Sequence, residues 1–285
     1  MIEVRKLVLG DEEELERFLS GRVDTTMFLR GNVRAVGLLD GPERYQGSYA
    51  AAFDGEHMLG AAAHYWNGNV VVDAPRALGE VVACAVAASG RSVRGILGPW
   101  SQVVEARAGL GLASAPTQLD SQEQLYAVDL ASLRVPSALA EGRVRCRPPH
   151  DDELDLATDW AIAYGIETLQ ESEGPDQRAS SRSRIETAQR EGRQWVLEAD
   201  GRPVAYTAFN AVLPDCVQVG GVFTPPALRG RSYARCAVAG SLIAARERGV
   251  RRSVLFTQSD NDAARSAYRA LGYQQVGDYG LVLFA

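Results

Sequence analysis

The stretch FTPPALRGRSYARC, residues 223–236, places two prolines, three arginines and a glycine directly before an alanine-rich segment. The apolar run before it, CVQVGGVF (216–223), is typical of a strand, and the prolines end that strand because proline donates no hydrogen bond to a sheet. The segment after it, SYARCAVAGSLIAARERG (232–249), has the composition and apolar spacing of a helix that ends at its last glycine. The stretch is therefore predicted to connect a strand to the N-terminus of a helix.

A turn of this kind is suited to binding an anion. Helix N-termini leave backbone N–H groups unpaired and carry partial positive charge. Gly230 lets a ligand approach the backbone, and Arg229, Arg231 and Arg235 can add charge-assisted hydrogen bonds. On its own, however, the turn is more simply interpreted as a solvated basic loop, so a phosphate site needs support from a second motif.

The second motif lies in VLFTQSDNDAARSAYRALGYQQVGDYGLVLF, residues 254–284. A strand is predicted to end near Gln258, and Asp260 or Asn261 is predicted to cap the helix that follows. Gly272 is expected to end that helix. A pair of strands then completes the chain.

Together the two motifs resemble those of the GCN5-related N-acetyltransferase (GNAT) family, over about residues 145–285. The family's loop pattern, Arg/Gln-x-x-Gly-x-Gly/Ala, is similar to RGRSYA at 229–234. Its later signature, Asn-x-x-Ala-x-x-x-Tyr followed by Gly-Phe/Tyr, is matched by Asn261, Ala264, Tyr268, Gly272 and Tyr273. Ser232 departs from the pattern, because the family usually has glycine there. A serine at this position would be strained only if its φ were positive, or would interfere if the ligand needed the space.

The resemblance implies that acetyl-CoA is the co-substrate. The pantetheine arm would lie along the end of the strand, paired with the backbone of Val222, Phe223 and Thr224. The pyrophosphate would bind the loop, whose residues are Arg229, Gly230, Arg231, Ser232, Tyr233 and Ala234. Asn261 joins this cofactor-binding set through the second motif.

The resemblance also implies acetyl transfer to a primary amine by direct attack, with a small molecule as the expected acceptor. The departing thiolate gains from a proton donor, and a tyrosine with a pKa near 10 carries its proton at pH 7. Tyr268 occupies the family's position for this general acid. The chain has no histidine after His150, so the base must be a carboxylate or water. Glu167 is the candidate, although a solvated glutamate is the simpler interpretation, and Asn210 and Tyr206 are further candidates for the acceptor side.

The two halves of the chain also show the same order of sequence features. Each half has a strand and helix, then a hairpin with an Asp-Gly turn at 54–55 or 200–201, then an alanine-rich helix. We therefore predict an α/β (α+β) fold of two tandem GNAT-like domains, 1–135 and 143–285, each a mixed, mostly antiparallel sheet flanked by helices. In the first, Arg107 stands where Tyr268 would be, and Glu80 would repel phosphate. We interpret this half as a degenerate copy that shapes the acceptor cleft, with Arg30, Arg34, His64, Tyr65 and Trp66 as candidate cleft residues.

Composition excludes several function classes. The net charge of −6 is unsuited to general nucleic-acid binding. The chain has no apolar run near the roughly 20 residues of a membrane span and no recognisable signal peptide, so the cytoplasm is the expected location. The few histidines and scattered cysteines show no zinc-binding spacing, and no metal is expected. Two alternatives stay open: an idle acyl-CoA-binding or sensor protein, and an acyltransferase with a non-amine acceptor.

Overall fold

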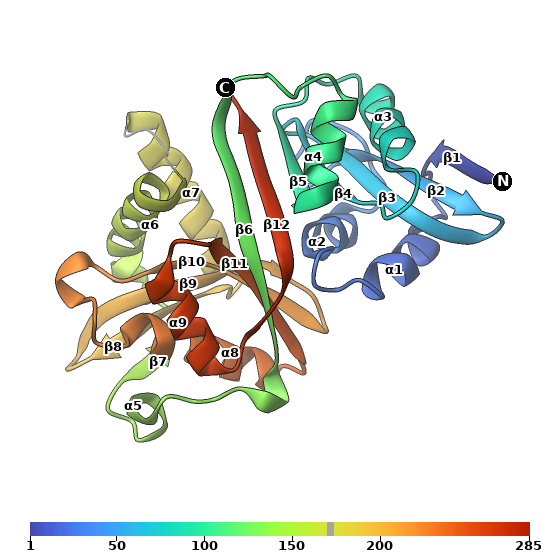
Figure 1. Cartoon of the computed structure of the whole chain (residues 1–285). Helices are drawn as coiled ribbons and strands as arrows, with labels where there is room; N and C mark the ends of the chain where they lie inside the picture. The colour runs from blue at the N-terminus through green and yellow to red at the C-terminus, as the bar shows by residue number, and fades with distance from the viewer. Residues whose placement is uncertain (170–173) are drawn as a thin grey trace. The chain divides into compact units, whose positions relative to one another are not determined.

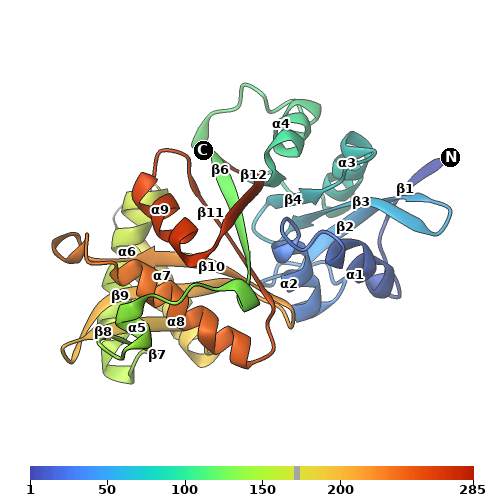
Figure 2. The ribbon, with the colours of Figure 1, turned by 60° about the horizontal axis from the view of Figure 1, so that its bottom comes forward.

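The computed structural model describes residues 1–169 and 174–285. The chain forms two compact units, one made of residues 1–125 with 276–285 and the other of residues 126–275. Each unit is a mixed, mostly antiparallel sheet with helices packed on both faces (Figures 1 and 2). The α/β (α+β) fold class predicted from the sequence is confirmed.

Unit 1 follows the order strand, two helices, hairpin, strand, helix, strand, helix. Its elements are β1 (Ile2–Lys6), α1 (Glu12–Ser20), α2 (Met27–Val36), β2 (Gly47–Asp54), β3 (His57–Tyr65), β4 (Asn69–Asp73), α3 (Leu78–Ser89), β5 (Gly95–Pro99), α4 (Trp100–Gly109) and β6 (Thr117–Asp129). The strands are ordered β1-β2-β3-β4-β5, and only β4 and β5 run parallel.

The central strands of unit 1 are buried on both faces. In β2, Tyr49, Ala51 and Phe53 pack with the helices α1 and α2, whereas Ala50 and Ala52 pack with α3 and α4. Side chains alternate between the two faces of a strand, so one short apolar run supplies two cores. The continuous run SYAAAF is thus explained by helices on both sides of the sheet.

Unit 2 repeats this order. Its elements are η1 (Leu130–Ser132), α5 (Ser137–Ala140), β7 (Arg145–Arg147), η2 (Asp151–Glu153), α6 (Leu154–Leu169), α7 (Pro175–Arg190), β8 (Gln194–Ala199), β9 (Arg202–Val212), β10 (Cys216–Phe223), η3 (Pro226–Leu228), α8 (Tyr233–Glu247), β11 (Arg252–Gln258), α9 (Asp262–Leu271) and the start of β12 (Gln274–Phe284). The strands are ordered β11-β10-β9-β8-β7, and again one pair, β10 with β11, is parallel. Val238 and Leu242 of α8 pack on one face, and Trp160 of α6 packs on the other.

The two units have unusual backbone conformations at equivalent positions. Both Asp-Gly hairpins are present, between β2 and β3 and between β8 and β9. Both alanine-rich helices begin after a residue in the left-handed conformation, Ala77 with φ 52° before α3 and Ser232 with φ 63° before α8. Few residues other than glycine adopt this conformation, so its recurrence at equivalent points agrees with the repeat expected from the sequence.

The end of the chain belongs with unit 1. Residues 279–283 of β12 pair antiparallel with residues 95–99 of β5. From the sequence, everything from residue 143 onward was instead predicted to lie in the second domain. Hydrophobic patterning identifies a strand but does not name its partner, so it could not show where this one pairs. The limits 1–135 and 143–285 of the two GNAT-like domains stay a prediction.

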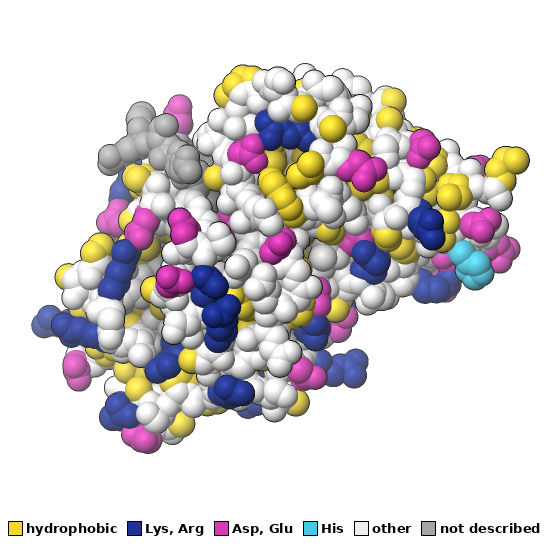
Figure 3. Space-filling view, viewed as in Figure 1, with side chains coloured by type: hydrophobic (Ala, Val, Ile, Leu, Met, Phe, Trp, Pro, Cys, Tyr) yellow, Lys and Arg dark blue, Asp and Glu magenta, His cyan; other side chains and the backbone are white. Residues whose placement is uncertain are grey.

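The surface has no broad basic area on the face shown in Figure 3, where acidic and basic side chains are interspersed. The described helices include none that is long and apolar enough to cross a membrane.

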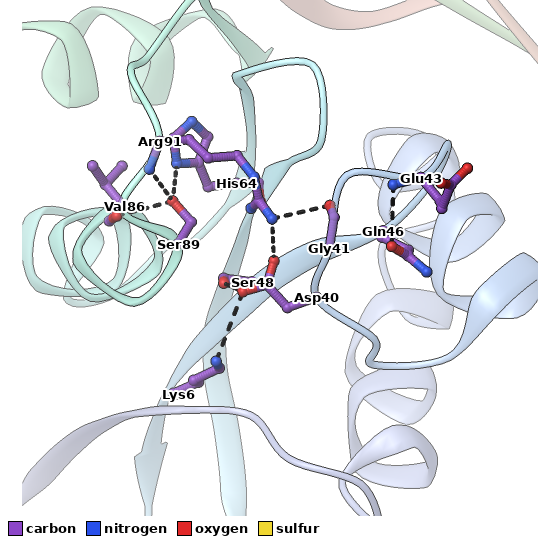
Figure 4. A network of polar contacts seen from close by, with 10 residues as sticks. All are labelled: Lys6, Asp40, Gly41, Glu43, Gln46, Ser48, His64, Val86, Ser89 and Arg91. Carbon is purple, nitrogen blue, oxygen red and sulfur yellow. Dashed lines mark hydrogen bonds and ion pairs between the residues drawn. The ribbon is translucent and has the colours of Figure 1, made fainter.

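A polar network joins the end of β3 in unit 1 to the end of α3 (Figure 4). The ring of His64 is fully buried, with Nδ1 2.5 Å from the Ser89 hydroxyl and Nε2 3.2 Å from the carbonyl oxygen of Gly68. Arg91 donates to the carbonyl oxygen of His64 and to the carboxylate of Asp40. Burial lowers the pKa of His64, and the positive charge of Arg91 lowers it further.

We expect acidification to destabilise the protein through this histidine. The unfolded chain gains a proton near the ordinary histidine pKa of about 6.5, but folded His64 does so only at lower pH. Stability contributed by the neutral ring is therefore lost as the pH falls below about 6.5. Between pH 7.5 and 5.5, the melting temperature of the wild type should fall further than that of His64→Gln, which cannot titrate. Equal losses in the two proteins would exclude His64 as the cause.

Candidate active site

The parallel strands of unit 2 stay paired over a short distance only. Residues 216–218 of β10 pair with residues 252–254 of β11, and the described strands share no later pair, although they continue to Phe223 and Gln258. On its other side β10 pairs with β9 through two register shifts, after Gln218 and after Gly220. Bulges of this kind bend a strand and increase its twist. The unpaired edge of β10 can therefore accept an extended ligand in place of a neighbouring strand.

The two glycines of β10 lie at the bend. Gly221 has a φ of 59°, which suits glycine. A Cβ on Gly220 would lie 2.1 Å from the side-chain nitrogen of Asn210, so a larger residue there would require the exposed Asn210 side chain to move. Asn210, predicted to face the acceptor side, therefore lies directly over the bulge.

The predicted pantetheine-binding residues lie at the end of this strand. Phe223 and Thr224 are buried and Val222 is half-buried. The Phe223 ring packs 6.3 Å from that of Trp160. The Thr224 hydroxyl is buried and has no hydrogen-bond partner in the described part of the chain.

The predicted phosphate loop presents unpaired backbone donors. Helix α8 begins at Tyr233, and its first backbone bond runs from the amide of Cys236 to the carbonyl of Ser232. Among the described residues, no backbone or side-chain oxygen accepts from the amides of residues 230–235. Six free amides at the N-terminus of a fifteen-residue helix form a site suited to a pyrophosphate.

The three arginines of the loop differ in their surroundings. Arg231 is exposed and makes no side-chain hydrogen bond or ion pair within the described residues. Arg235 donates to the Ser232 hydroxyl at 3.1 Å. Arg229 is occupied, because it donates to the Thr224 carbonyl and to the carboxylate of Glu167. Arg231 is therefore the cation most available to a phosphate.

Ser232 adopts the positive φ that would strain a residue other than glycine. The departure from the glycine of the loop pattern therefore has a conformational cost, of order 1 kcal/mol.

Tyr268 combines a buried ring with an unoccupied hydroxyl. Its ring packs in the core between β11 and α8, 5.9 Å from that of Tyr273. Its hydroxyl makes no hydrogen bond to the described residues and is not among their buried unpaired atoms. By contrast, the Tyr273 hydroxyl lies 2.7 Å from that of Ser253. Burial raises the pKa of Tyr268 well above its usual value, and nearby Tyr164 raises it further.

Helix α6 aligns three side chains toward the end of β10. Trp160, Tyr164 and Glu167 follow one another at helical spacing, so they share one face. Trp160 contacts Phe223, and Glu167 contacts Arg229. Between them, Tyr164 raises the pKa of the Tyr268 hydroxyl. Tyr164 was not predicted as a site residue, although its helical spacing from Trp160 and Glu167 was a signal in the sequence.

The remaining predicted residues have structural contacts. The side chain of Asn261 caps α9 by accepting from the amide of Ala264 at 3.0 Å, which leaves its amide nitrogen for a ligand. Tyr206 is buried, and its hydroxyl donates to Gln194 at 3.0 Å.

In unit 1 the equivalent strand edge is covered. The backbone of β5 closes against β4, since a Cβ on Gly98 would lie 2.4 Å from the Val72 carbonyl oxygen. The amide of Ala74, just beyond β4, donates to the side chain of Gln102 at 2.7 Å. The buried carboxylate of Asp73 is held by Arg22 and Thr25. In unit 1 these side chains cover the strand edge that corresponds to the open edge of β10 in unit 2.

Several unit 1 candidates are core residues instead of cleft residues. Arg30 is buried and paired with Glu16 at 2.7 Å, and Tyr65 is buried with its hydroxyl 2.9 Å from that of Tyr49. His64 belongs to the network of Figure 4. The sequence alone could not separate Arg30, His64 and Tyr65 from cleft residues because each is polar or aromatic and none had a known partner. Arg107, which was not a cleft candidate but aligns with Tyr268 in the sequence repeat, donates to the carbonyls of Leu112 and Ala115 and closes the loop after α4.

The second unit contains a segment that matches a known protein family. Residues 156–273 match the model of the Acetyltransferase (GNAT) family. This segment is a GNAT acetyltransferase domain. No curated protein matches the chain in sequence.

Solved structures similar to the whole chain support the tandem GNAT fold. A GCN5-related N-acetyltransferase from Kribbella flavida is 18% identical, with a TM-score of 0.57, over 93% of this chain and 95% of that one. One from Sphaerobacter thermophilus is 12% identical, with a TM-score of 0.57, over 99% and 94%. A tandem GNAT protein from the clavulanic acid biosynthesis pathway is 15% identical, with a TM-score of 0.50, over 100% and 98%. At these identities the likeness concerns the fold alone.

We expect one acetyl-CoA molecule to bind each chain. Unit 2 offers an open strand edge, whereas side chains fill the equivalent edge of unit 1 and Glu80 stands in the first turn of α3. Calorimetric titration of the full chain with acetyl-CoA should give a stoichiometry near one. Two equivalents bound per chain would contradict the assignment of unit 1 as a degenerate copy.

We also expect Ser232→Gly to stabilise the protein by up to about 1 kcal/mol. The substitution relieves the left-handed strain, and the greater freedom of glycine in the unfolded chain offsets part of the gain. Ser259 is a matched control because it is also exposed but has a negative φ, so Ser259→Gly should destabilise slightly. Urea unfolding of both variants is the measurement. A loss of stability in Ser232→Gly would show that the serine is not strained.

Proposed function

We propose that the protein is an acetyl-CoA-dependent N-acetyltransferase that acts on a primary amine of a small molecule. The observation that carries the proposal is the pairing of two features in unit 2, the free amides of residues 230–235 and the unoccupied Tyr268 hydroxyl. The loop follows β10 and the helix of Tyr268 follows β11, so both lie beyond the carboxyl ends of the two diverging strands. Open α/β sheets bind ligands at such a position.

Each part of acetyl-CoA is assigned to the part of the site whose hydrogen-bonding groups suit it. The pyrophosphate of acetyl-CoA would accept from the amides of Gly230, Arg231, Ser232, Tyr233 and Ala234, with the guanidinium of Arg231 adding charge. The pantetheine amides would pair with the backbone of Val222, Phe223 and Thr224 at the open edge of β10. Asn261 keeps a side-chain donor for the same ligand.

In the proposed reaction, the amine nitrogen forms a bond to the thioester carbonyl carbon, the carbon–sulfur bond breaks, and its electron pair leaves with sulfur. Tyr268 donates its hydroxyl proton toward that sulfur. Because burial raises its pKa, Tyr268 keeps its proton at neutral pH. It therefore acts first as a hydrogen-bond donor, and the proton moves as negative charge builds on sulfur.

The acceptor must lose a proton to attack and to form the neutral amide. An α-amine, with a pKa near 7.8, reaches its neutral form more readily at pH 7 than a lysine-like amine near 10.4. The amine proton passes to a base, which the lack of histidine after His150 limits to a carboxylate or water. Glu167 was the carboxylate predicted from the sequence, but it already accepts from Arg229. The proposal retains the cytoplasm as the expected location.

Turnover measurements distinguish the amine acetyltransferase from a sensor protein and from an acyltransferase with a non-amine acceptor. Purified protein with acetyl-CoA, tested against panels of amines, amino acids, aminoglycosides and peptides for thiol release, should show acceptor-dependent activity. Binding of acetyl-CoA without turnover of any acceptor would favour a sensor. Turnover with hydroxyl compounds alone would favour a non-amine acceptor.

We expect Tyr268→Phe to lower kcat by roughly 10²- to 10⁴-fold, about 3 to 5 kcal/mol of barrier, with little change in acetyl-CoA affinity. The hydroxyl is lost, but the ring still packs in the core. Steady-state kinetics at saturating acetyl-CoA, with calorimetric binding, measure both quantities.

The neighbouring tyrosine provides the control. Tyr273→Phe removes a hydroxyl that already bonds Ser253, so it should cost about 1 to 3 kcal/mol of stability and leave kcat within a few-fold. A wild-type kcat in folded Tyr268→Phe would remove Tyr268 from the mechanism.

A further inference from the structure

The two charged residues proposed from sequence for different tasks bind each other. Nη2 of Arg229 lies 2.6 Å from Oε2 of Glu167, which lies near the end of α6. This contact joins a helix to the start of the phosphate loop across 62 residues of sequence. It is therefore a tertiary contact that the sequence pattern could not display.

Arg229 is fixed at three points. Its Nε donates to the carbonyl oxygen of Thr224 at 3.0 Å, and its guanidinium carbon lies 5.9 Å from the centroid of the Phe223 ring. With Glu167 holding the other end, the side chain spans the turn that leads from β10 into the loop. A guanidinium engaged in this way has fewer donors left for a phosphate.

The position of Glu167 also requires an explanation. The last turn of α6 has no basic residue, and a carboxylate near a helix C-terminus is unfavourable because the dipole there is negative. Its pairing with Arg229 offsets this cost. The face it shares with Trp160 contacts the same turn, because Trp160 packs on Phe223.

We propose that Glu167 and Arg229 form a clamp that holds the backbone of residues 223–229 in the conformation that receives acetyl-CoA. In this assignment both are positioning residues: Glu167 is not the general base, and Arg229 is not a direct phosphate ligand. The inference rests on the proposed function, since it concerns the same cofactor site.

The clamp lies at the surface, and this sets the expected size of its effect. The side chains of Arg229 and Glu167 are 45% and 52% exposed. Exposed ion pairs contribute about 0 to 1 kcal/mol, so breaking the clamp should weaken acetyl-CoA binding by roughly five-fold or less. Losing a direct ligand or a catalytic base would cost far more.

The test is a charge swap. Calorimetry should show acetyl-CoA affinity reduced about two- to five-fold in Glu167→Arg and in Arg229→Glu, and restored to within two-fold in the double variant. A loss of 100-fold or more in Arg229→Glu that the double variant does not repair would show that Arg229 binds phosphate directly. Affinities in both single variants equal to that of the wild type would also overturn the clamp.

A second readout separates the clamp from a base. In Glu167→Gln, kcat with saturating substrates should change less than three-fold, and the pH profile of kcat should keep its acidic limb. A fall of 100-fold or more, with loss of that limb, would restore Glu167 as the base.

The chain offers a matched control on the same helix. Arg178 and Asp159 join α7 to α6 at 2.7 Å and are 53% and 55% exposed, so they resemble the clamp in exposure and geometry. Asp159→Arg and Arg178→Asp should leave acetyl-CoA affinity unchanged; a loss equal to that of the clamp variants would show a general charge effect and overturn the clamp. If wild-type protein binds no acetyl-CoA, the proposed function itself fails, and that outcome is distinct from a swap that fails to rescue.

Discussion

The site of unit 2 depends on the early divergence of two parallel strands. Paired parallel strands satisfy the hydrogen-bonding groups of each other's backbones. Strands β10 and β11 lose this pairing after three paired residues. The irregular pairing of β10 with β9, the left-handed Gly221 and the close fit of Asn210 over Gly220 all act on this bend. Every other part of the proposed site is arranged around it, because the loop, α8, β11 and α9 are placed by where the two strands lead.

The two units show what the divergence contributes. Unit 1 has the same order of elements, a parallel pair and a left-handed residue before its alanine-rich helix. It nevertheless has close backbone contact at Gly98 and side-chain bonds at the edge that unit 2 leaves open. The same fold therefore forms with this edge either covered or open, and the contrast between β4 and β10 is more informative about binding than the likeness of the helices.

Local patterns predicted the elements well and their partners poorly. Prolines 225 and 226, the cap at Asn261 and the stop at Gly272 act within a few residues, so the helices and strands around the site could be placed from sequence. The pairing of Glu167 with Arg229 and of β12 with β5 depends on residues far apart in the chain, and no local signal encodes them. Ser232 is an intermediate case, because its position was known but its φ was needed to see the strain.

The location of the last strand has a consequence for biosynthesis. Strand β5 pairs with residues 279–283, which follow the whole of unit 2 in the sequence. A domain made early in translation normally folds as soon as it leaves the ribosome, but in unit 1 this edge of β5 stays uncovered until unit 2 has been synthesised. Until then the nascent chain exposes an unpaired strand edge, which is a site for wrong pairing. A chain truncated before residue 279 would thus have a first unit with this edge open, and such a product is a natural substrate for chaperones and proteases.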